Sequence, residues 1–319
     1  MTVAASANDP ETGPVIRTFD RADFDPVRLA RAKRATTVSV CLPARDEGAT
    51  VGHIVDVICT ELVRRTGLVD EVVVIDDGST DDTAAVAAAS GARVEHAADV
   101  LTDFSPGGGK GDALWRSLHV ADGDIVVWCD ADITNFHPDF ITGLVGPLVM
   151  NAEIGFVKGY YERPGTSAGE VGGRVTELVA RPLIALLFPE LAPVVQPLSG
   201  EYGGRRDVLE ALPFVTGYGV DLGLLIDVTT RFGLGALAQV DLGTRLHRHR
   251  PLDDLGPMAL EVMQTAFLRA GLPFDRALLA TLVRPGVEAV ERVHIERPPL
   301  VTVPRYQARR RLAARQRPA

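Results

Sequence analysis

Residues 123–132 read Gly-Asp-Ile-Val-Val-Trp-Cys-Asp-Ala-Asp, and they are the best starting point for predicting the fold. Its five successive apolar residues predict a strand that is covered on both faces, as in a parallel sheet. Asp130 and Asp132 follow at once, and in an extended chain they point to the same side. Two adjacent carboxylates repel each other unless a cation lies between them, and Mg²⁺ or Mn²⁺ prefers such oxygen ligands. The alternative is a solvated strand end that caps a helix beginning near Pro138.

The composition is that of a soluble globular protein. The chain has 319 residues, 46% of them hydrophobic and 24% charged, enough for one large domain or two small ones. A net charge of −9 argues against nucleic acid as a partner. The longest apolar stretch, residues 178–188, is interrupted by Arg181 and Pro182, so we expect no membrane span, and we expect no signal peptide. The three cysteines lack metal-site spacing, which favours buried thiols in a reducing, cytoplasmic setting.

Strand and helix patterns alternate in the first half of the chain. We predict buried strands at residues 36–42 and 71–75, with a helix between them at residues 50–65. A third, short strand is predicted at residues 92–95. This alternation indicates an α/β fold with a mostly parallel sheet, flanked by helices and joined by right-handed crossovers. Ligands of such sheets bind beyond the carboxyl ends of the strands. We therefore expect three strand-end segments to converge on one crevice: residues 43–47, 76–79 and 130–132.

Two loops in this half have both an ordinary and a functional interpretation. The turn at residues 76–82 is a good helix cap, but Asp77 is equally suited to accept hydrogen bonds from a nucleobase or ribose. The glycine-rich residues 105–111 do not have the spacing of a Walker loop. Lys110 lies beside these glycines and before a helix predicted at residues 112–119, which suits a phosphate or a nucleotide. A solvated surface loop is the alternative.

The second half of the chain contains three further candidates. A glycine turn with Arg174 precedes a helix predicted at residues 175–187, a pattern typical of an anion site and also of an ordinary helix start. His247 and His249 alternate with arginines in an extended segment, which indicates an anion or a metal nearby. Asp221 precedes an apolar helix, so a helix cap is its simplest interpretation.

Motifs along the chain resemble those of known glycosyltransferases. Four in the first half look like the nucleotide-sugar half of a GT-A-type glycosyltransferase, at residues 40–47, 75–81, 109–111 and 130–132. Four in the second half resemble the actinobacterial glucosyl-3-phosphoglycerate synthases, at residues 174–178, 196–202, 217–221 and 247–252. The resemblance covers residues 37–272 and implies a GT-A-type, Rossmann-like sheet with a smaller C-terminal region for the acceptor and for dimerisation.

The resemblance also implies roles for individual residues. The catalytic residues would be Asp221, Leu198 and Lys110, and the ligands of a Mg²⁺ or Mn²⁺ ion would be Asp132, His247 and Asp130. The UDP-sugar would contact Pro43, Ala44, Arg45, Glu47, Asp77, Lys110, Asp130, Ala131, Asp132, Tyr218 and Asp221. The phosphoglycerate acceptor would contact Gly173, Arg174, Val175, Thr176, Arg245 and His249. The chain departs from the family at three positions: it has Asp46 where the family usually has Asn, Asp221 in place of Glu, and His249 in place of Asn.

The activity implied by the resemblance is transfer of glucose from UDP-glucose to the 2-hydroxyl of 3-phosphoglycerate, with a divalent cation and retention of anomeric configuration. Three alternatives stay open: a mannosyl-3-phosphoglycerate synthase that uses GDP-mannose, an inverting GT-A transferase with another acceptor and Asp221 as general base, and a non-catalytic UDP-binding module. The resemblance further implies a homodimer in the cytoplasm. We expect an N-terminal tail and basic segment at residues 1–35 and a nucleotide-sugar half at residues 36–150. An acceptor half with dimerisation helices is expected at residues 151–295, and a basic tail without fixed structure at residues 296–319.

Overall fold

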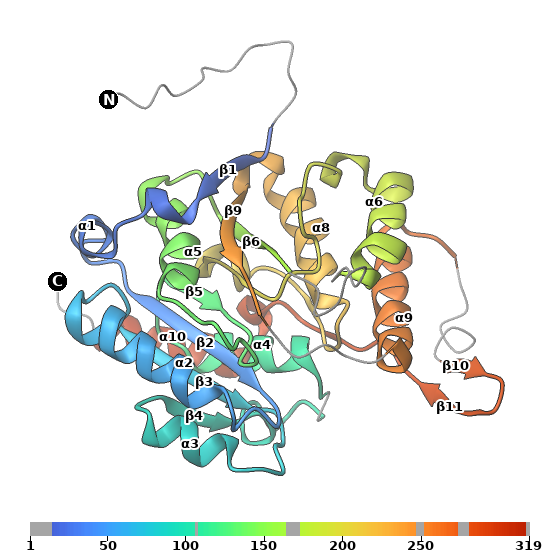
Figure 1. The fold of residues 1–319 in the computed structure, drawn as a ribbon, viewed down its shortest axis with the longest axis horizontal. Coiled ribbons are helices and arrows are strands. Elements are labelled where there is room, and N and C mark those ends of the chain that lie inside the picture. The colour runs from blue at the N-terminus through green and yellow to red at the C-terminus, as the bar shows by residue number, and fades with distance from the viewer. Residues whose placement is uncertain (1–14, 106–107, 164–172, 247–251, 274–280, 317–319) are drawn as a thin grey trace.

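The computed structural model describes residues 15–105, 108–163, 173–246, 252–273 and 281–316. Within them the chain folds around one eight-stranded sheet (Figure 1). Across this sheet the strands are β1 (Arg17–Asp20), β9 (Leu237–Thr244), β6 (Phe156–Glu162), β7 (Tyr202–Arg205), β5 (Ile125–Trp128), β2 (Val38–Ala44), β3 (Glu71–Asp76) and β4 (Arg93–His96). Neighbouring strands run parallel except β7, which is antiparallel to both β5 and β6. The predicted α/β class with a mostly parallel sheet is confirmed.

Helices flank this sheet (Figure 1). They are α1 (Pro26–Ala32), α2 (Val51–Val57), α3 (Thr83–Ala89), α4 (Lys110–Val120), α5 (Asp139–Met150), α6 (Arg181–Leu187), α7 (Arg206–Leu209), α8 (Val220–Phe232), α9 (Leu252–Arg269) and α10 (Pro304–Gln316). Two π-helical segments extend them, Ile58–Arg65 after α2 and Thr176–Ala180 before α6. Two small sheets pair β10 (Thr281–Arg284) with β11 (Val287–Glu291) and β8 (Phe214–Val215) with β12 (Glu296–Arg297). Among the described residues, no helix is long and apolar enough to cross a membrane.

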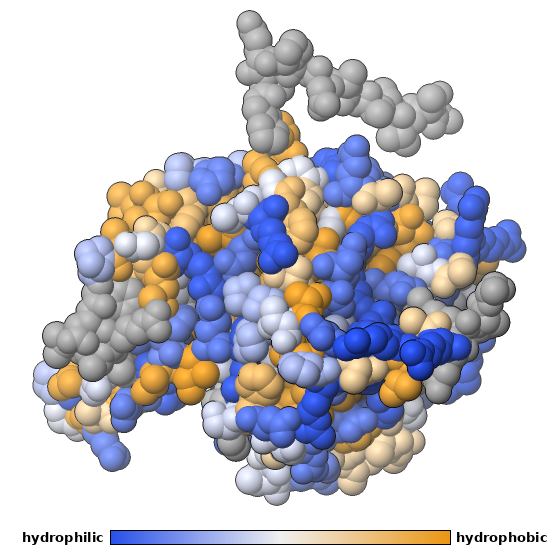
Figure 2. All heavy atoms as spheres, turned by 180° about the vertical axis from the view of Figure 1, so that it is seen from behind, coloured by the Kyte–Doolittle hydropathy of each residue, from blue (hydrophilic) through white to orange (hydrophobic). Residues whose placement is uncertain are grey.

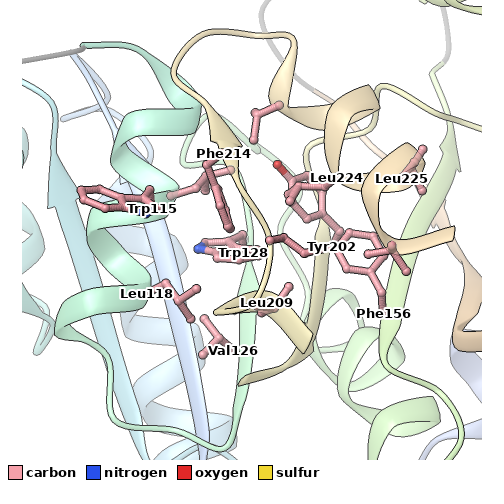
Figure 3. Packing of buried hydrophobic residues seen from close by; sticks show 14 of the residues in the cluster. Trp115, Leu118, Val126, Trp128, Phe156, Tyr202, Leu209, Phe214, Leu224 and Leu225 are labelled. Atoms are coloured by element: carbon pink, nitrogen blue, oxygen red, sulfur yellow. The ribbon is translucent and has the colours of Figure 1, made fainter. Parts of the chain in front are cut away.

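The apolar run of β5 is explained by two hydrophobic cores, one on each face of the sheet. Ile125 and Val127 belong to the core that α2 and α5 cover. Val126 and Trp128 belong to the core that α4 and α8 cover, and Figure 3 shows this second core from close by. Because side chains alternate along a strand, every residue of β5 is buried and the strand reads as one apolar stretch.

Trp128 fixes the end of β5, two residues before the first aspartate of the motif. Its Nε1 donates a hydrogen bond to Ser117 Oγ at 2.8 Å. Its ring packs edge-on against Tyr202 and Phe214, with centroids 5.6 and 6.0 Å away (Figure 3). An aromatic ring held on three sides leaves the strand end little freedom, so the position of Asp130 is set by the core.

The two ends of the chain differ from the sequence-based expectation. Of the expected N-terminal tail, residues 15–35 are structured: β1 adds an edge strand to the sheet beside β9, and α1 follows it. The expectation that residues 296–319 lack fixed structure is wrong for 296–316, which form β12 and α10. Tyr306 of α10 is 2% exposed, and its hydroxyl donates to Glu210 and accepts from Arg206. One buried aromatic side chain thus anchors an otherwise basic helix.

Candidate active site

A cavity of about 930 Å³ opens beyond the carboxyl ends of β2, β3 and β5. Residues from all three strand ends line it, so the predicted convergence is confirmed. Every predicted site residue that the structure describes also lines this cavity: Pro43, Ala44, Arg45, Glu47, Asp77, Lys110, Asp130, Ala131, Asp132, Gly173, Arg174, Val175, Thr176, Leu198, Tyr218, Asp221 and Arg245. The other two predicted residues, His247 and His249, lie outside the described residues.

The two aspartates after β5 share one guanidinium. Arg245 is 3% exposed and places Nη2 3.1 Å from Asp130 Oδ2 and 2.6 Å from Asp132 Oδ1. Its Nε lies 3.1 Å from Glu201 Oε1. Burial raises the pKa of Asp130, but the charges of Lys110 and Arg245 outweigh burial and hold that pKa below its ordinary value. Asp130 is therefore ionised at neutral pH.

The chemistry of these donors fits a hard divalent cation. The side chains of Asp130 and Asp132 are 27% and 26% exposed, and both line the cavity. Carboxylate oxygens at an open cavity are ligands that Mg²⁺ and Mn²⁺ prefer, with water or a ligand phosphate completing the coordination. Within the described part of the chain no group of three metal-ligating side chains gathers, and His247 lies outside that part.

Lys110 connects this strand end to the second half of the chain. Its Nζ lies 3.2 Å from Asp130 Oδ1 and 3.4 Å from Asp221 Oδ1. Burial lowers the pKa of Lys110, but the two carboxylates outweigh it and raise the pKa above its ordinary value, so the ammonium persists. The close approach of α4 to this point requires Gly111, since a Cβ there would lie 1.7 Å from the carbonyl oxygen of Val215.

Asp221 does not act as the simple helix cap that the sequence suggests. Helix α8 begins at Val220, after Gly219, so Asp221 is inside the first turn. Asp221 is 5% exposed, and its carboxylate points toward Lys110. The sequence predicts that the helix starts after Asp221, since the glycines around this position obscure the helical pattern.

The wall formed by the first half of the chain is built from turn residues. Asp77 Oδ2 accepts a hydrogen bond from the backbone nitrogen of Gly109 at 2.9 Å. Burial raises the pKa of Asp77, while this hydrogen bond and the nearby Arg45 oppose the rise. Asp46 has a φ of 56°, and its Oδ1 accepts from Thr80 N at 2.7 Å. Asn and Asp both tolerate this left-handed backbone and supply such an oxygen, so the departure from the family's Asn preserves the turn.

The opposite wall carries the glycine turn with Arg174. Gly173 has a φ of 88°, which favours glycine, and its carbonyl oxygen accepts from Glu177 N at 3.0 Å. The predicted helix at 175–187 is present as the π-helical segment followed by α6. The cationic residues on the cavity wall, in a chain of net charge −9, are Arg45, Lys110, Arg163, Arg174, Arg245 and Arg292.

Sequence reasoning missed several residues of this site. Glu261 of α9 accepts a hydrogen bond from Tyr218 N at 2.6 Å and thereby supports the loop before α8. Lys158 and Glu201 are buried behind the cavity wall, at 1% and 0% exposure. The available signal was Lys158 as the one charged residue in the stretch 154–161, and a lysine is usually expected at the surface rather than buried. Glu201 lies in a glycine-rich stretch and gives no such signal.

Comparison with known proteins gives consistent matches. The family model described as Glycosyl transferase family 2 matches residues 39–207. Glucosyl-3-phosphoglycerate synthases of Petrotoga mobilis and Mycobacterium tuberculosis strain H37Rv are 41% and 49% identical, over 91% and 88% of this chain and 95% and 88% of those proteins.

Solved structures agree with these sequence matches. A glucosyl-3-phosphoglycerate synthase from M. tuberculosis, in complex with Mn²⁺, UDP-glucose and phosphoglyceric acid, has a TM-score of 0.82 at 46% identity, covering 90% of this chain and 98% of that one. A mannosyl-3-phosphoglycerate synthase from Rubrobacter xylanophilus has a TM-score of 0.82 at 39% identity, covering 90% and 97%.

Fold, cavity and family match together define a glycosyltransferase of family 2 with a GT-A-type fold. Within it, the chain belongs to the glucosyl-3-phosphoglycerate synthase family.

Gly200 provides a test of how tightly the first aspartate is held. An added Cβ at this position would lie 1.9 Å from Asp130 Oδ2, so Gly200→Ala must displace that carboxylate. We expect transferase kcat/KM to fall roughly 10²-fold, the effect typical of displacing a catalytic group by about 1 Å. Gly235→Ala is the matched control, because nothing lies within 4 Å of its added Cβ. Equal activity of the two variants would contradict the assignment of Asp130 to the site.

Proposed function

We propose that this chain transfers glucose from UDP-glucose to the 2-hydroxyl of 3-phosphoglycerate, using Mg²⁺ or Mn²⁺ and retaining the anomeric configuration. The observation that carries the proposal is one cavity with paired aspartates on one wall and the Gly173–Arg174 helix start on another. A donor diphosphate with its cation and a small polyanionic acceptor require these two kinds of site within reach of each other. The M. tuberculosis enzyme, crystallised with Mn²⁺ and both substrates, supports the proposal at 46% identity.

On the donor side, Asp130 and Asp132 would hold the divalent cation, with His247 as the candidate third ligand. When bound, the cation supplies Lewis-acid compensation for charge on the diphosphate. The ammonium of Lys110, 3.2 Å from Asp130, adds positive charge at the same wall and opposes charge developing on the leaving oxygen. Asp77 and Arg45, with neighbouring residues of the first wall, would contact the uridine.

On the acceptor side, 3-phosphoglycerate is a compact polyanion entering a chain of net charge −9. It therefore needs local cations and backbone donors, and Arg174 at the start of a helical segment offers both. Arg163, also on the cavity wall, is a further candidate contact that sequence analysis did not name.

We assign Asp221, which lines the cavity, to the hydroxyl groups of the donor sugar. Its Oδ1 lies 3.4 Å from Lys110 Nζ and 3.9 Å from Lys158 Nζ. Both ammonium groups lie beside the same oxygen, so ion pairs hold the carboxylate at the wall of the cavity that it lines. A carboxylate held in this way can accept hydrogen bonds from sugar hydroxyls, which is the role that a retaining transfer leaves to it.

The second candidate function is the GDP-mannose-dependent reaction. The R. xylanophilus mannosyl-3-phosphoglycerate synthase shares the fold with a TM-score of 0.82 at 39% identity, which favours this alternative over any other donor. The experiment that separates the two is incubation with UDP-glucose, GDP-glucose or GDP-mannose, each with and without 3-phosphoglycerate. We expect a product only with UDP-glucose and the acceptor together, with an α-anomeric proton by NMR. A mannosyl product would reject the choice of glucose, and a β product would reject retention.

The metal assignment can be checked at Asp132. Asp132→Ala removes a charged oxygen ligand, so we expect kcat/KM to fall by roughly 10²-fold or more. EDTA should abolish wild-type activity, and added Mg²⁺ or Mn²⁺ should restore it. Asp122→Ala serves as the control, since that carboxylate pairs with Arg309 on the surface. Full activity of the metal-free enzyme would refute the assignment.

The acceptor assignment can be checked at Arg174. A charge-assisted hydrogen bond contributes about 1.5–3 kcal/mol, so Arg174→Ala should raise KM for 3-phosphoglycerate roughly 10- to 100-fold. KM for UDP-glucose should change little. Arg181→Ala, which removes an exposed arginine paired with Glu177 at 3.0 Å, should leave both values unchanged. If Arg174→Ala weakens donor and acceptor equally, Arg174 does not belong to the acceptor site.

We also propose a homodimer that uses the helical segment around α6. Leu178 and Leu186 on this segment are 76% and 78% exposed, a large apolar area for a surface helix. On the face shown in Figure 2, apolar residues gather in groups between hydrophilic ones. A cytoplasmic setting is proposed as well, supported by three buried cysteines that remain free thiols.

The dimer proposal predicts the behaviour of one surface variant. Leu186→Glu would place a charge in the interface, so we expect a monomer by light scattering where the wild type is a dimer. Leu312→Glu on α10, also at an exposed leucine, should leave the dimer intact. A monomeric wild type at micromolar concentration would refute the proposal.

A further inference from the structure

The chain contains only three lysines against 30 arginines, and two of the three flank Asp221. Lys110 lines the cavity and has a place in the proposed reaction. Lys158 is not among the described residues that line the cavity, although its ammonium lies beside the same carboxylate. The carboxylate of Asp221 is therefore approached by a second ammonium, that of Lys158, from outside the cavity lining.

The register of the sheet sets the position of Lys158. It lies on β6 directly opposite Tyr202 of β7, and Tyr202 lies in turn opposite Trp128 of β5. Residues that are opposite in antiparallel strands point to the same face, so the three side chains share the face that α8 covers. Lys158 Nζ lies 4.0 Å from the centroid of the Tyr202 ring and 3.9 Å from Asp221 Oδ1.

The surroundings of this ammonium leave Asp221 as its nearest counter-charge. The side chain of Lys158 is 2% exposed, and its Nζ makes no hydrogen bond within the described part of the protein. A buried ammonium without a hydrogen bond costs free energy that only an opposite charge and a π-face can offset here. The pKa of Tyr202 is raised by burial and by the carboxylate of Asp221, which places all three groups in one cluster.

We propose that Lys158 is a positioning residue, whose ammonium attracts Asp221 from behind the cavity wall and holds it in the orientation that meets the donor sugar. This inference rests on the proposed function, because it takes the sugar as the partner of Asp221. A lysine suits the task because its compact charge draws one carboxylate oxygen, whereas a guanidinium tends to engage both. Asp221 thereby keeps an oxygen for the ligand.

A double-mutant cycle tests whether Lys158 acts through Asp221. We expect Lys158→Met to lower kcat roughly 10- to 100-fold, as about 1 Å of misplacement does, with KM for 3-phosphoglycerate unchanged. Asp221→Asn should lower kcat at least as much. The double variant should be no slower than Asp221→Asn alone, because Lys158 has no carboxylate left to orient once Asp221 is replaced by Asn.

Lys33→Met is the matched control for removing a buried lysine. Lys33 is 8% exposed and pairs with Asp70, and it does not line the cavity. We expect it to lower the melting temperature and leave kcat unchanged. If Lys158→Met does not fold, Lys158→Gln keeps hydrogen-bond donors without the charge and is measured in its place.

The pH dependence of kcat gives a second readout that a purely structural lysine would not change. Burial lowers the pKa of Lys158 to about 8, with Lys110 adding to the fall and Asp221 opposing it. The ammonium is present below that pKa and lost above it, so wild-type kcat should decline above about pH 8. The decline should be absent in Lys158→Met. The charged and titratable groups around Lys158 are Asp221, Lys110, Tyr202, Glu201 and Asp130.

Two results overturn the inference while leaving the proposed function intact. They are multiplicative losses in the double variant and an unchanged alkaline decline in Lys158→Met, each with a wild type that makes glucosyl-phosphoglycerate. If the wild type instead uses another donor or acceptor, the proposed function fails. The same cycle, measured with that substrate pair, then still decides whether Lys158 acts through Asp221.

Discussion

The balance of buried charge behind the cavity is the constraint on which the rest of this structure depends. Four carboxyl groups meet three cations there: Asp130, Asp132, Glu201 and Asp221 against Lys110, Lys158 and Arg245. Removing one partner of a buried pair leaves an uncompensated charge, which is strongly destabilising. These groups come from β6, α4, α8, the segment before β7 and the segments after β5 and β9, so the charges tie six parts of the chain together. The excess of one carboxyl group lies at a cavity wall, where a divalent cation is favourable.

Strand β7 makes this arrangement possible because it runs against its neighbours. The parallel strands β2, β3 and β5 reach the cavity with their carboxyl ends. The antiparallel strand β7, between β5 and β6, brings its amino-terminal end to the same edge, with Tyr202 at that end and Gly200 and Glu201 just before it. Glu201 reaches Arg245, and Tyr202 offers its ring to Lys158.

The sequence predicts the features that depend on local pattern. The apolar strands and polar strand ends indicate the sheet and the crevice, because β2, β3 and β5 are each covered on both faces. Strand β7 is not predicted by this pattern, since Gly203 and Gly204 lack the apolar side chains that would indicate a strand. Those glycines are needed, as added Cβ atoms would lie 2.6 Å from Val126 O and 2.7 Å from Gly155 O. Helix α10 escapes for a related reason, because Tyr306 is its one aromatic anchor among many arginines.

Arginine and lysine occupy different kinds of buried position in this chain, and the geometry of their charged groups explains the difference. Arg206 is 3% exposed and donates to the carbonyl oxygens of Gly123, Leu118 and Ala121, which fixes the loop before β5 as a rigid frame. A planar group with five donors suits a frame that must not move. At Asp221 the requirement is different, because a carboxylate fully engaged by a guanidinium has no oxygen left for a ligand. Two lysine ammonium groups approach its Oδ1 as point charges and leave the other oxygen for a sugar hydroxyl, so an arginine-rich chain has reason to keep lysine at these positions.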